Sequence, residues 1–277
     1  MSTAADGEGK MSRVTDANAA ADPEANPVLT ERRGPVLIVT INRPHARNAI
    51  NKAVAEGIAA AMDTLDGDPE LSVGILTGAG GTFCAGMDLK AFVRGENPHV
   101  EGRGFAGLTF APPRKPLIAA VEGWALAGGC EIVLACDLIV ASDTAKFGIP
   151  EVKRGLAAGA GGLFRLPVRI PYHVAMELIL TGDHVEAPRA YELGLVNKLT
   201  QSGGALDAAL EYATKIAANG PLAVIASKNI VQHAGGWSDE EAQVKQGDVL
   251  RPVMTSEDAI EGSKAFAEKR PPVWRGR

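Results

Sequence analysis

The sequence has 277 residues, of which 46% are hydrophobic and 22% are charged, and its formal net charge is -5. A chain of this length can bury one large core, or one core and a smaller appendage, and the acidic balance disfavours nucleic acid as a partner. The three cysteines, with no ligand-like histidine spacing around them, suggest neither a disulfide framework nor a metal site, so the expected location is the reducing cytoplasm.

The first 26 residues lack the continuous apolar segment of a signal peptide and are too acidic for a transit peptide. We therefore expect residues 1–26 to form a disordered tail. No later run reaches the roughly 18 apolar residues that a membrane helix needs, so no membrane partner is expected.

Beyond the tail, short apolar runs alternate with helical stretches. Continuous rather than alternating apolar strands predict a mostly parallel sheet that is covered on both faces. The fold class is therefore α/β, with a core domain over residues 27–203. The expected strands are residues 36–41, 72–78, 116–123 and 136–142, and the first helix is expected within residues 51–68.

From about Ala205 the strand pattern disappears and the chain consists of successive helical segments. Two of these begin at Ser238 and Ser256, each followed within three residues by Glu, which is typical of helix N-caps. The turn at residues 202–204 is the expected boundary of a C-terminal helical domain over residues 204–277.

Two glycine-rich turns follow predicted strands, where α/β folds place their ligands. They are TGAGGTFCAGMDLK (77–90) and EGWALAGGCEIV (122–133). Neither turn has the spacing of a phosphate-binding nucleotide motif. Since such turns expose backbone N–H groups, one donor from each could form an oxyanion hole for a carbonyl oxygen.

Glu131 is the single charged residue in GWALAGGCEIVLAC (123–136), and a buried carboxylate needs a partner or a task. If a helix begins near Gly128, Glu131 could stabilise the helix terminus or face a cavity. Glu151 follows 20 residues later, after a proline and before a glycine cluster at residues 155–162. Two carboxylates beside an oxyanion hole could hold and activate one water molecule.

From about Val28 onwards the chain resembles the crotonase (enoyl-CoA hydratase/isomerase) superfamily. The resemblance rests on NRPHARNA (42–49), FCAGMDLK (83–90) and EGWALAGGCEIVLACD (122–137). It implies a crotonase-like ββα spiral core with a C-terminal helical trimerisation region. It also implies that Met87 and Gly128 supply the two oxyanion-hole N–H donors, and that Glu131 and Glu151 are the catalytic glutamates.

The activity that this resemblance implies is enoyl-CoA hydratase, the syn addition of water across the 2,3-double bond of a 2-enoyl-CoA thioester. No separate cofactor is expected, because coenzyme A is part of the substrate. GFAGLT (104–109) and the C-terminal segment also resemble carnitinyl-CoA dehydratases, which gives one alternative. An enoyl-CoA isomerase, or a protein that only binds acyl-CoA or RNA, are the others. Ala158, Leu163 and Phe164 depart from the residues common in hydratases and suggest a reshaped acyl pocket.

The resemblance further implies binding of coenzyme A by two sets of residues. Backbone contacts are expected from Arg47, Ala49, Ala85, Asp88 and Leu89. Phe266 and Lys269 are expected to approach the nucleotide bound by a neighbouring subunit of a homotrimer or homohexamer. Cys84 and Cys130 are expected to be packing residues, and none of the five histidines is assigned to chemistry.

Overall fold

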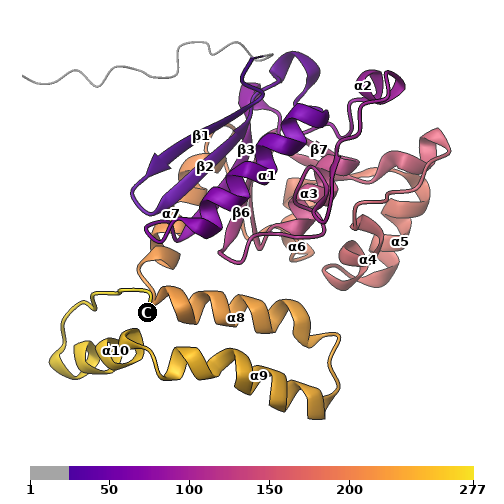
Figure 1. Ribbon diagram of the computed structural model, residues 1–277. Helices are drawn as coiled ribbons and strands as arrows, with labels where there is room; N and C mark the ends of the chain where they lie inside the picture. Colours follow the sequence, from indigo (N-terminus) through magenta and orange to yellow (C-terminus); the bar gives the residue numbers. More distant parts are fainter. Residues whose placement is uncertain (1–24) are drawn as a thin grey trace, which may run out of the picture.

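The computed structural model describes residues 25–277 (Figure 1), and residues 1–24 of the predicted tail lie outside the described part. A six-stranded sheet forms the centre of the molecule. Its strands, in spatial order, are β1 (Val28–Arg33), β2 (Val36–Ile41), β3 (Val73–Gly78), β6 (Leu117–Val121), β8 (Leu138–Ser142) and β11 (Lys198–Thr200). Only β1 is antiparallel to its neighbour, so the predicted mostly parallel sheet is confirmed.

Helices cover both faces of this sheet, as the buried apolar runs of its strands require. On one face lies α7 (Ala205–Ala217), whose small residues Ala205, Ala209 and Ala213 are fully buried against β2, β3, β6 and β8. The other face packs against the larger core cluster, which includes α1 (Lys52–Gly67). The helix predicted within residues 51–68 is thus confirmed, and Asn51 caps it by accepting a hydrogen bond from Val54 N at 3.1 Å.

A second, smaller layer carries the elements that approach the site. It contains a three-stranded sheet in the order β10 (His184–Glu186), β9 (Lys146–Gly148) and β7 (Trp124–Leu126), together with a hairpin of β4 (His99–Val100) and β5 (Gly104–Phe105). The short helices of this layer are α2 (Leu89–Val93), α3 (Gly128–Ala135), α4 (Gly162–Arg165), α5 (Tyr172–Thr181) and α6 (Ala187–Glu192). Short 3-10 helices are η1 (Pro44–Ala46), η2 (Ala79–Gly81), η3 (Pro150–Arg154) and η4 (Leu166–Val168).

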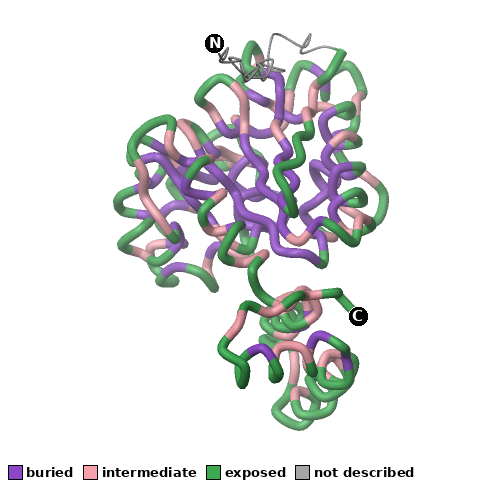
Figure 2. Tube along the Cα trace, turned by 90° about the vertical axis from the view of Figure 1, so that its left-hand side faces the viewer, coloured by how far each residue is buried: buried purple, intermediate pink, exposed green. Residues whose placement is uncertain are grey.

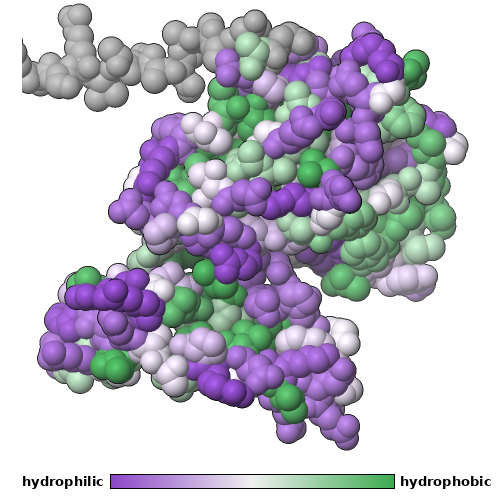
Figure 3. Space-filling view, in the orientation of Figure 1, coloured by the Kyte–Doolittle hydropathy of each residue, from purple (hydrophilic) through white to green (hydrophobic). Residues whose placement is uncertain are grey.

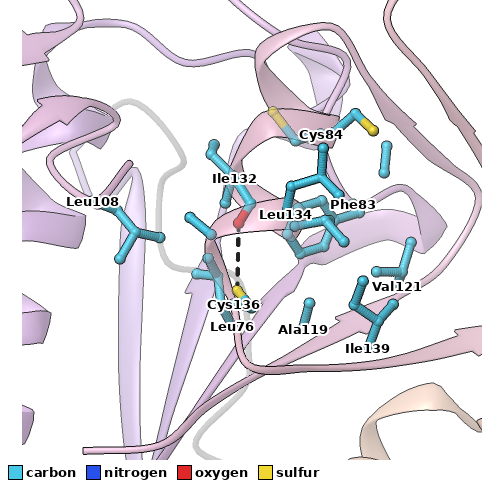
Figure 4. Packing of buried hydrophobic residues seen from close by; sticks show 14 of the residues in the cluster. Leu76, Phe83, Cys84, Leu108, Ala119, Val121, Ile132, Leu134, Cys136 and Ile139 are labelled. Carbon is cyan, nitrogen blue, oxygen red and sulfur yellow. Dashed lines mark hydrogen bonds between the residues drawn. The ribbon is translucent and has the colours of Figure 1, made fainter. Parts of the chain in front are cut away.

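The core between the layers is close-packed and almost entirely apolar (Figure 4). Cys84, Cys130 and Cys136 are free and buried within it, and burial raises the pKa of each thiol to about 12. Cys136 Sγ donates to the Ile132 carbonyl at 3.4 Å, which Figure 4 marks. The cysteines are therefore neutral packing residues, as predicted.

The last three helices lie apart from the sheet layers (Figures 1 and 2). They are α8 (Pro221–Ala234), α9 (Asp239–Met254) and α10 (Glu257–Glu268). The predicted N-caps are confirmed: Ser238 forms a capping box with Glu241, and Ser256 accepts from Ala259 N at 3.0 Å. None of the helices between residues 25 and 277 is long and apolar enough to cross a membrane.

The structure places α7 on the central sheet, although α7 follows the turn at residues 202–204. The next helix, α8, is linked to the core through Lys228, which donates to the Lys115 carbonyl at 2.9 Å and to Asp137 Oδ2 at 2.6 Å. The return of the chain after α10 ties these helices together, because Trp274 Nε1 donates to the Ala218 carbonyl at 2.8 Å. The division at residue 204 stays a prediction about domains, and the packing of α7 attaches the first of the C-terminal helices to the core.

Candidate active site

The two glycine-rich turns lie side by side because the segment before Met87 runs parallel to β7. Cys84 N donates to the Trp124 carbonyl at 2.9 Å, and Leu126 N donates to the Cys84 carbonyl at 3.0 Å. The contact is so close that a Cβ on Gly129 would lie 2.2 Å from the Cys84 carbonyl oxygen. Glycine is therefore required where the turns touch.

The amides of Met87 and Gly128 are both free at this junction. Ile50 N donates to the Gly86 carbonyl and Asp88 N donates to the Ile50 carbonyl, so the N–H of Met87 points to the opposite side of the pairing. Gly128 is the first residue of α3, and its N–H has no carbonyl within the helix. Among residues 25–277 neither amide has an acceptor, and both residues line one cavity.

That cavity has a volume of about 390 Å³. Its wall is mostly apolar, with contributions from Leu89, Phe105, Leu126 and Leu156. The structure brings all four predicted catalytic residues to it: the two amides above and the carboxylates of Glu131 and Glu151. A pocket with an apolar wall and a few convergent polar groups is typical of a small-molecule site.

Glu131 lies in the first turn of α3 and is only 3% exposed. Its Oε1 accepts hydrogen bonds from Ala160 N at 2.7 Å and Gly162 N at 2.9 Å. Ala160 lies in the glycine-rich loop after η3 and Gly162 is the first residue of α4, so the carboxylate does not cap its own helix, α3. Burial raises the pKa of Glu131, while these two hydrogen bonds oppose that effect by favouring the ionised form.

The second oxygen of this carboxylate, Oε2, has no hydrogen-bond partner among residues 25–277 and belongs to a residue that lines the cavity. The loop that holds Oε1 is itself anchored, because Arg165 donates to the carbonyls of Ala160 at 3.2 Å and Thr109 at 2.5 Å. The Glu131 carboxylate is therefore held in place through Oε1, while Oε2 remains available to a ligand in the cavity.

Glu151 lies at the start of η3, directly after Pro150. Its Oε2 is buried, with no hydrogen-bond partner among the described residues. Burial, reinforced by the nearby charge of Glu131, raises the pKa of Glu151 to about 7, although the Glu151 amide and the charge of Arg154 act in the opposite direction. The two carboxyl groups in this cavity thus have different surroundings, since Glu131 accepts two amide hydrogen bonds and Oε2 of Glu151 has no partner among the described residues.

The residues predicted to contact coenzyme A gather around the first turn. Ala85 N donates to the Arg47 carbonyl at 3.0 Å, which joins the 42–49 turn to the glycine-rich turn at residues 77–90. Arg43 fastens the same turn through the Ala49 carbonyl at 2.7 Å and Asp88 at 3.0 Å. Ala85 and Leu89 line the cavity.

Asp88 makes more hydrogen bonds within the protein than the sequence suggested. Its carboxylate caps α2 through Ala91 N at 3.0 Å and pairs with Arg43, and its N–H donates to the Ile50 carbonyl. The Asp88 carbonyl accepts from Phe92 N at 2.9 Å, so its N–H, its carbonyl and both carboxylate oxygens are all engaged within the protein.

The structure does not bring Phe266 and Lys269 to this cavity. Phe266 is 88% exposed on α10, which Figure 1 places at the opposite end of the molecule from α2 and α3. Ala158, Leu163 and Phe164 are also absent from its wall, so the expected reshaping by these three residues does not occur through direct lining.

Among the side chains at the cavity that were not singled out from the sequence are those of Phe105, His99 and Arg154. Phe105 and His99 come from the β4–β5 hairpin, with ring centroids 5.6 Å apart, and Arg154 comes from the end of η3. The spacing of Arg154 from Glu151 was a usable signal, because i and i+3 residues share a side of a 3-10 helix. No local pattern identifies His99, whose position depends on how the hairpin folds back.

Comparison with known proteins agrees with this geometry. A family model described as enoyl-CoA hydratase/isomerase matches residues 31–277. An enoyl-CoA hydratase EchA19 of Mycobacterium tuberculosis is 45% identical over 260 residues, covering 90% of this chain and 96% of the relative. A carnitinyl-CoA dehydratase of Proteus mirabilis is 42% identical over 253 residues, covering 88% and 97%.

Solved structures give the same result. The crystal structure of an enoyl-CoA hydratase from M. tuberculosis is 64% identical and superposes with a TM-score of 0.89, covering 91% of this chain and 99% of that one. A carnitinyl-CoA hydratase from Mycobacterium avium is 46% identical with a TM-score of 0.73 and covers 91% and 99%. With this fold, this match along nearly the whole described chain and these paired turns, the protein belongs to the enoyl-CoA hydratase/isomerase family.

Proposed function

We propose that this protein is an enoyl-CoA hydratase, which adds water across the 2,3-double bond of a 2-enoyl-CoA thioester. The observation that carries the proposal is the pair of carboxyl groups in one cavity, beside two free backbone amides. Oε2 of Glu151 is buried without a partner, and Oε2 of Glu131 is uncommitted. One water molecule between the two carboxyl groups would satisfy both oxygens.

In the proposed reaction the thioester carbonyl accepts hydrogen bonds from Met87 N and Gly128 N. The N-terminal end of α3 adds its positive dipole at the same place. These donors stabilise the enolate that forms when the water oxygen bonds to C3. Because both amides are fixed by the turns, little reorganisation is needed as the negative charge develops.

The two carboxyl groups manage the protons. Glu131, whose ionised form is favoured by two amide donors against the burial that raises its pKa, takes one proton from the water. Glu151, whose raised pKa keeps a proton available near neutral pH, gives that proton to C2. One C–O bond and one C–H bond form while the C–C π bond is lost, and a proton passes from Glu131 to Glu151 to restore the starting state. Both groups line the same cavity, and syn addition requires that both act on one face of the double bond.

We further propose that the segment from Arg47 to Leu89 binds the coenzyme A part of the substrate. Ala85 and Leu89 already line the cavity. The Arg47 carbonyl accepts from Ala85 N and so joins the 42–49 turn to the glycine-rich turn at residues 77–90. The reaction moves protons and forms a C–O bond without electron transfer, so the proposal includes no cofactor other than the coenzyme A of the substrate.

We also propose that the protein forms a homotrimer or homohexamer. No residue of α9 is buried, and large apolar side chains such as Val231, Val244 and Met254 are exposed on α8 and α9. Figure 3 shows apolar side chains over α8, next to a groove of about 1170 Å³ between α8 and the core. A second copy could cover these surfaces and bring its own Phe266 and Lys269 towards the coenzyme A of its neighbour.

A second candidate function is dehydration of carnitinyl-CoA, which the 42% identity to a carnitinyl-CoA dehydratase favours. It is the same class of lyase reaction, run in the opposite direction on a different acyl group. The non-catalytic alternative receives no support from the cavity, since both carboxyl groups are present and converge there.

The test is the loss of enoyl-thioester absorbance after adding the protein to a panel of 2-enoyl-CoA substrates of different lengths. Carnitinyl-CoA and a 3-enoyl-CoA are assayed in parallel for the dehydratase and isomerase activities. Turnover of at least one 2-enoyl-CoA, lost in the Glu131→Gln variant, supports the proposal. Binding of the thioesters without turnover of any of them would contradict it.

A further inference from the structure

Glu151 and Arg154 occupy the two ends of η3 and both line the cavity. A 3-10 helix has about three residues per turn, so side chains at i and i+3 lie on the same side. The spacing therefore directs a guanidinium to the side of the helix from which Glu151 enters the site. Arg154 is therefore placed near the carboxyl group that is proposed to react, and we consider its effect on that group.

The charge of Arg154 is not used elsewhere in the described chain. Arg154 makes no hydrogen bond or ion pair with any other of residues 25–277, apart from its electrostatic effect on Glu151. The adjacent Lys153 contrasts with it, because Lys153 Nζ lies 2.6 Å from Asp183 Oδ1, just beyond α5. Two neighbouring cations on one short helix thus face different partners.

Other charged or titratable groups around Glu151 have been compared with Arg154. Glu131, from α3, and His99, from the β4–β5 hairpin, line the same cavity as Glu151. The helix α5 packs against η3 and carries Tyr172, His173 and Glu177, all exposed. Of all these groups, only Glu131 and Arg154 shift the pKa of Glu151: Glu131 raises it and Arg154 lowers it.

The opposite effects of Glu131 and Arg154 on the pKa of Glu151 matter because Glu151 is proposed to act as an acid, which must release its proton. Burial and the negative charge of Glu131 both hold the proton on Glu151 and would make it a weak acid. A nearby positive charge stabilises the carboxylate that remains after proton transfer. Proton transfer is most efficient when the pKa of the acid lies near the working pH.

We propose that Arg154 is a positioning residue for the hydration step, and that its guanidinium keeps the buried Glu151 carboxyl acidic enough to release a proton to C2 in each turnover. This inference rests on the proposed hydratase function. It assigns to Arg154 a role that acts through Glu151, without contact with the substrate.

The experiment compares Arg154→Gln and Arg154→Lys with Lys153→Gln, a matched control that removes the same charge from the adjacent residue. In Arg154→Gln the alkaline limb of the kcat/KM pH profile should move up by about half a unit to one unit, because Arg154 is exposed and solvent screens its charge. At the pH optimum kcat should fall about 3- to 10-fold with little change in KM, since Glu151 becomes a weaker acid.

Arg154→Lys should restore most of the wild-type profile, and Lys153→Gln should leave it unmoved. Identical profiles for Arg154→Gln and Lys153→Gln would overturn the proposal. The proposal would also be overturned if Arg154→Gln left the alkaline limb of the pH profile unmoved and raised KM only for substrates whose acyl group carries a carboxylate. Arg154 would then bind the substrate directly.

A measurement without turnover separates this inference from the proposed function. Protein labelled with ¹³C at the glutamate side-chain carboxyl is titrated by NMR, and the Glu151 signal is identified by its loss in Glu151→Gln. The Glu151 midpoint should rise in Arg154→Gln and stay in Lys153→Gln. If the wild-type protein hydrates no enoyl-CoA while these midpoints separate as expected, the proposed reaction fails but the effect of Arg154 on Glu151 stands. If the midpoints coincide, the inference fails whatever the activity.

Discussion

The amide of Gly162 donates to Oε1 of Glu131 at 2.9 Å, across 31 residues of sequence. A Cβ on Gly162 would lie 3.2 Å from that oxygen and 3.1 Å from Cγ of Glu131, so the close approach favours glycine. The loop that holds the carboxylate also leaves its other oxygen for the cavity. Five predictions follow from this site and its surroundings.

Replacing either of the two carboxyl groups proposed to be catalytic should lower kcat far more than it changes KM. In Glu131→Gln and Glu151→Gln the size of the side chain is kept, but proton transfer is lost, and we expect kcat to fall by about 10²- to 10⁴-fold. The measurement is the steady-state hydration of a 2-enoyl-CoA. A variant that retains near wild-type turnover would remove that glutamate from the mechanism.

Side-chain changes at Met87 and Gly128, the two proposed oxyanion donors, should differ in effect, because the proposed donors are backbone groups. A Cβ on Gly128 would lie 2.5 Å from Cε1 of Phe105, so Gly128→Val should displace the turn and cost about 10²-fold or more in kcat. Met87→Leu keeps the amide in place and should retain most of the activity.

The ring of Phe105 provides the control for this comparison. If the clash is the cause, Phe105→Leu should recover part of the activity of Gly128→Ala in the double variant. A Gly128→Val variant with full activity would contradict the placement of this donor.

Stability should depend on pH through Glu151. Its pKa is raised to about 7 in the folded chain from an ordinary value of 4.5, so between these values the folded state binds a proton that the unfolded state has released. The free energy of unfolding should therefore fall as the pH rises through this window. Glu151→Gln removes that loss, and its stability relative to wild type should be greater at pH 8 than at pH 5.

Urea unfolding at the two pH values measures this difference. Equal differences between variant and wild type at both pH values would show that Glu151 titrates alike in the folded and unfolded chains.

An ion pair holds α8 against the core. Lys228 Nζ lies 2.6 Å from Asp137 Oδ2, and their side chains are only 8% and 21% exposed. Lys228→Met leaves the Asp137 charge partly buried, so we expect a loss of about 1–3 kcal/mol in the free energy of unfolding. Lys245→Met breaks an exposed pair with Glu241 in α9 and should cost much less stability. Equal losses in the two variants would contradict the importance of the Lys228 pair.

The proposed contact of α10 with a neighbouring subunit can be tested with point substitutions. Truncating the chain after Gly262 would remove Phe266 and Lys269 together with Arg270 and Trp274. Arg270 pairs with Glu261 and Trp274 donates to the Ala218 carbonyl, so the truncation would also loosen α10. Phe266→Ala and Lys269→Ala should instead raise KM for the enoyl-CoA while kcat stays close to wild type.

Lys264→Ala on the same helix is the matched control and should leave KM unchanged. Sedimentation must show the same oligomer for all three variants. Unchanged KM in both test variants would exclude this role for α10, and a wild-type protein that sediments as a monomer would exclude the assembly itself.

The sequence predicted those parts of the molecule whose structure is determined by short runs of neighbouring residues. The apolar runs of β2, β3, β6 and β8 need burial on both faces, and the glycine turns must follow such strands to expose their amides. By contrast, β1 is half-exposed or exposed along its length and pairs at the edge of the sheet, so its sequence carries no continuous apolar pattern.

The walls of the site were harder to predict for a related reason. Phe105 and His99 reach the cavity through a hairpin with two residues in each strand, too short for a periodic pattern. The position of α7 was missed as well, because the alanines that let it approach the sheet predict a helix without naming its partner. Glu131 and Glu151 were found because charged residues in apolar or glycine-rich surroundings stand out in the sequence alone.

The two kinds of wall around the cavity offer different freedom to protein engineers. The amide-bearing turns touch through glycines that tolerate no added carbon, whereas Leu156 and Ala157 lie on an exposed loop after η3. A mutational library confined to that loop and to Phe105 could vary the shape offered to the acyl group while the proton-transfer residues and the amide donors stay in register. New substrate ranges should therefore be easier to select from this scaffold than new reaction types.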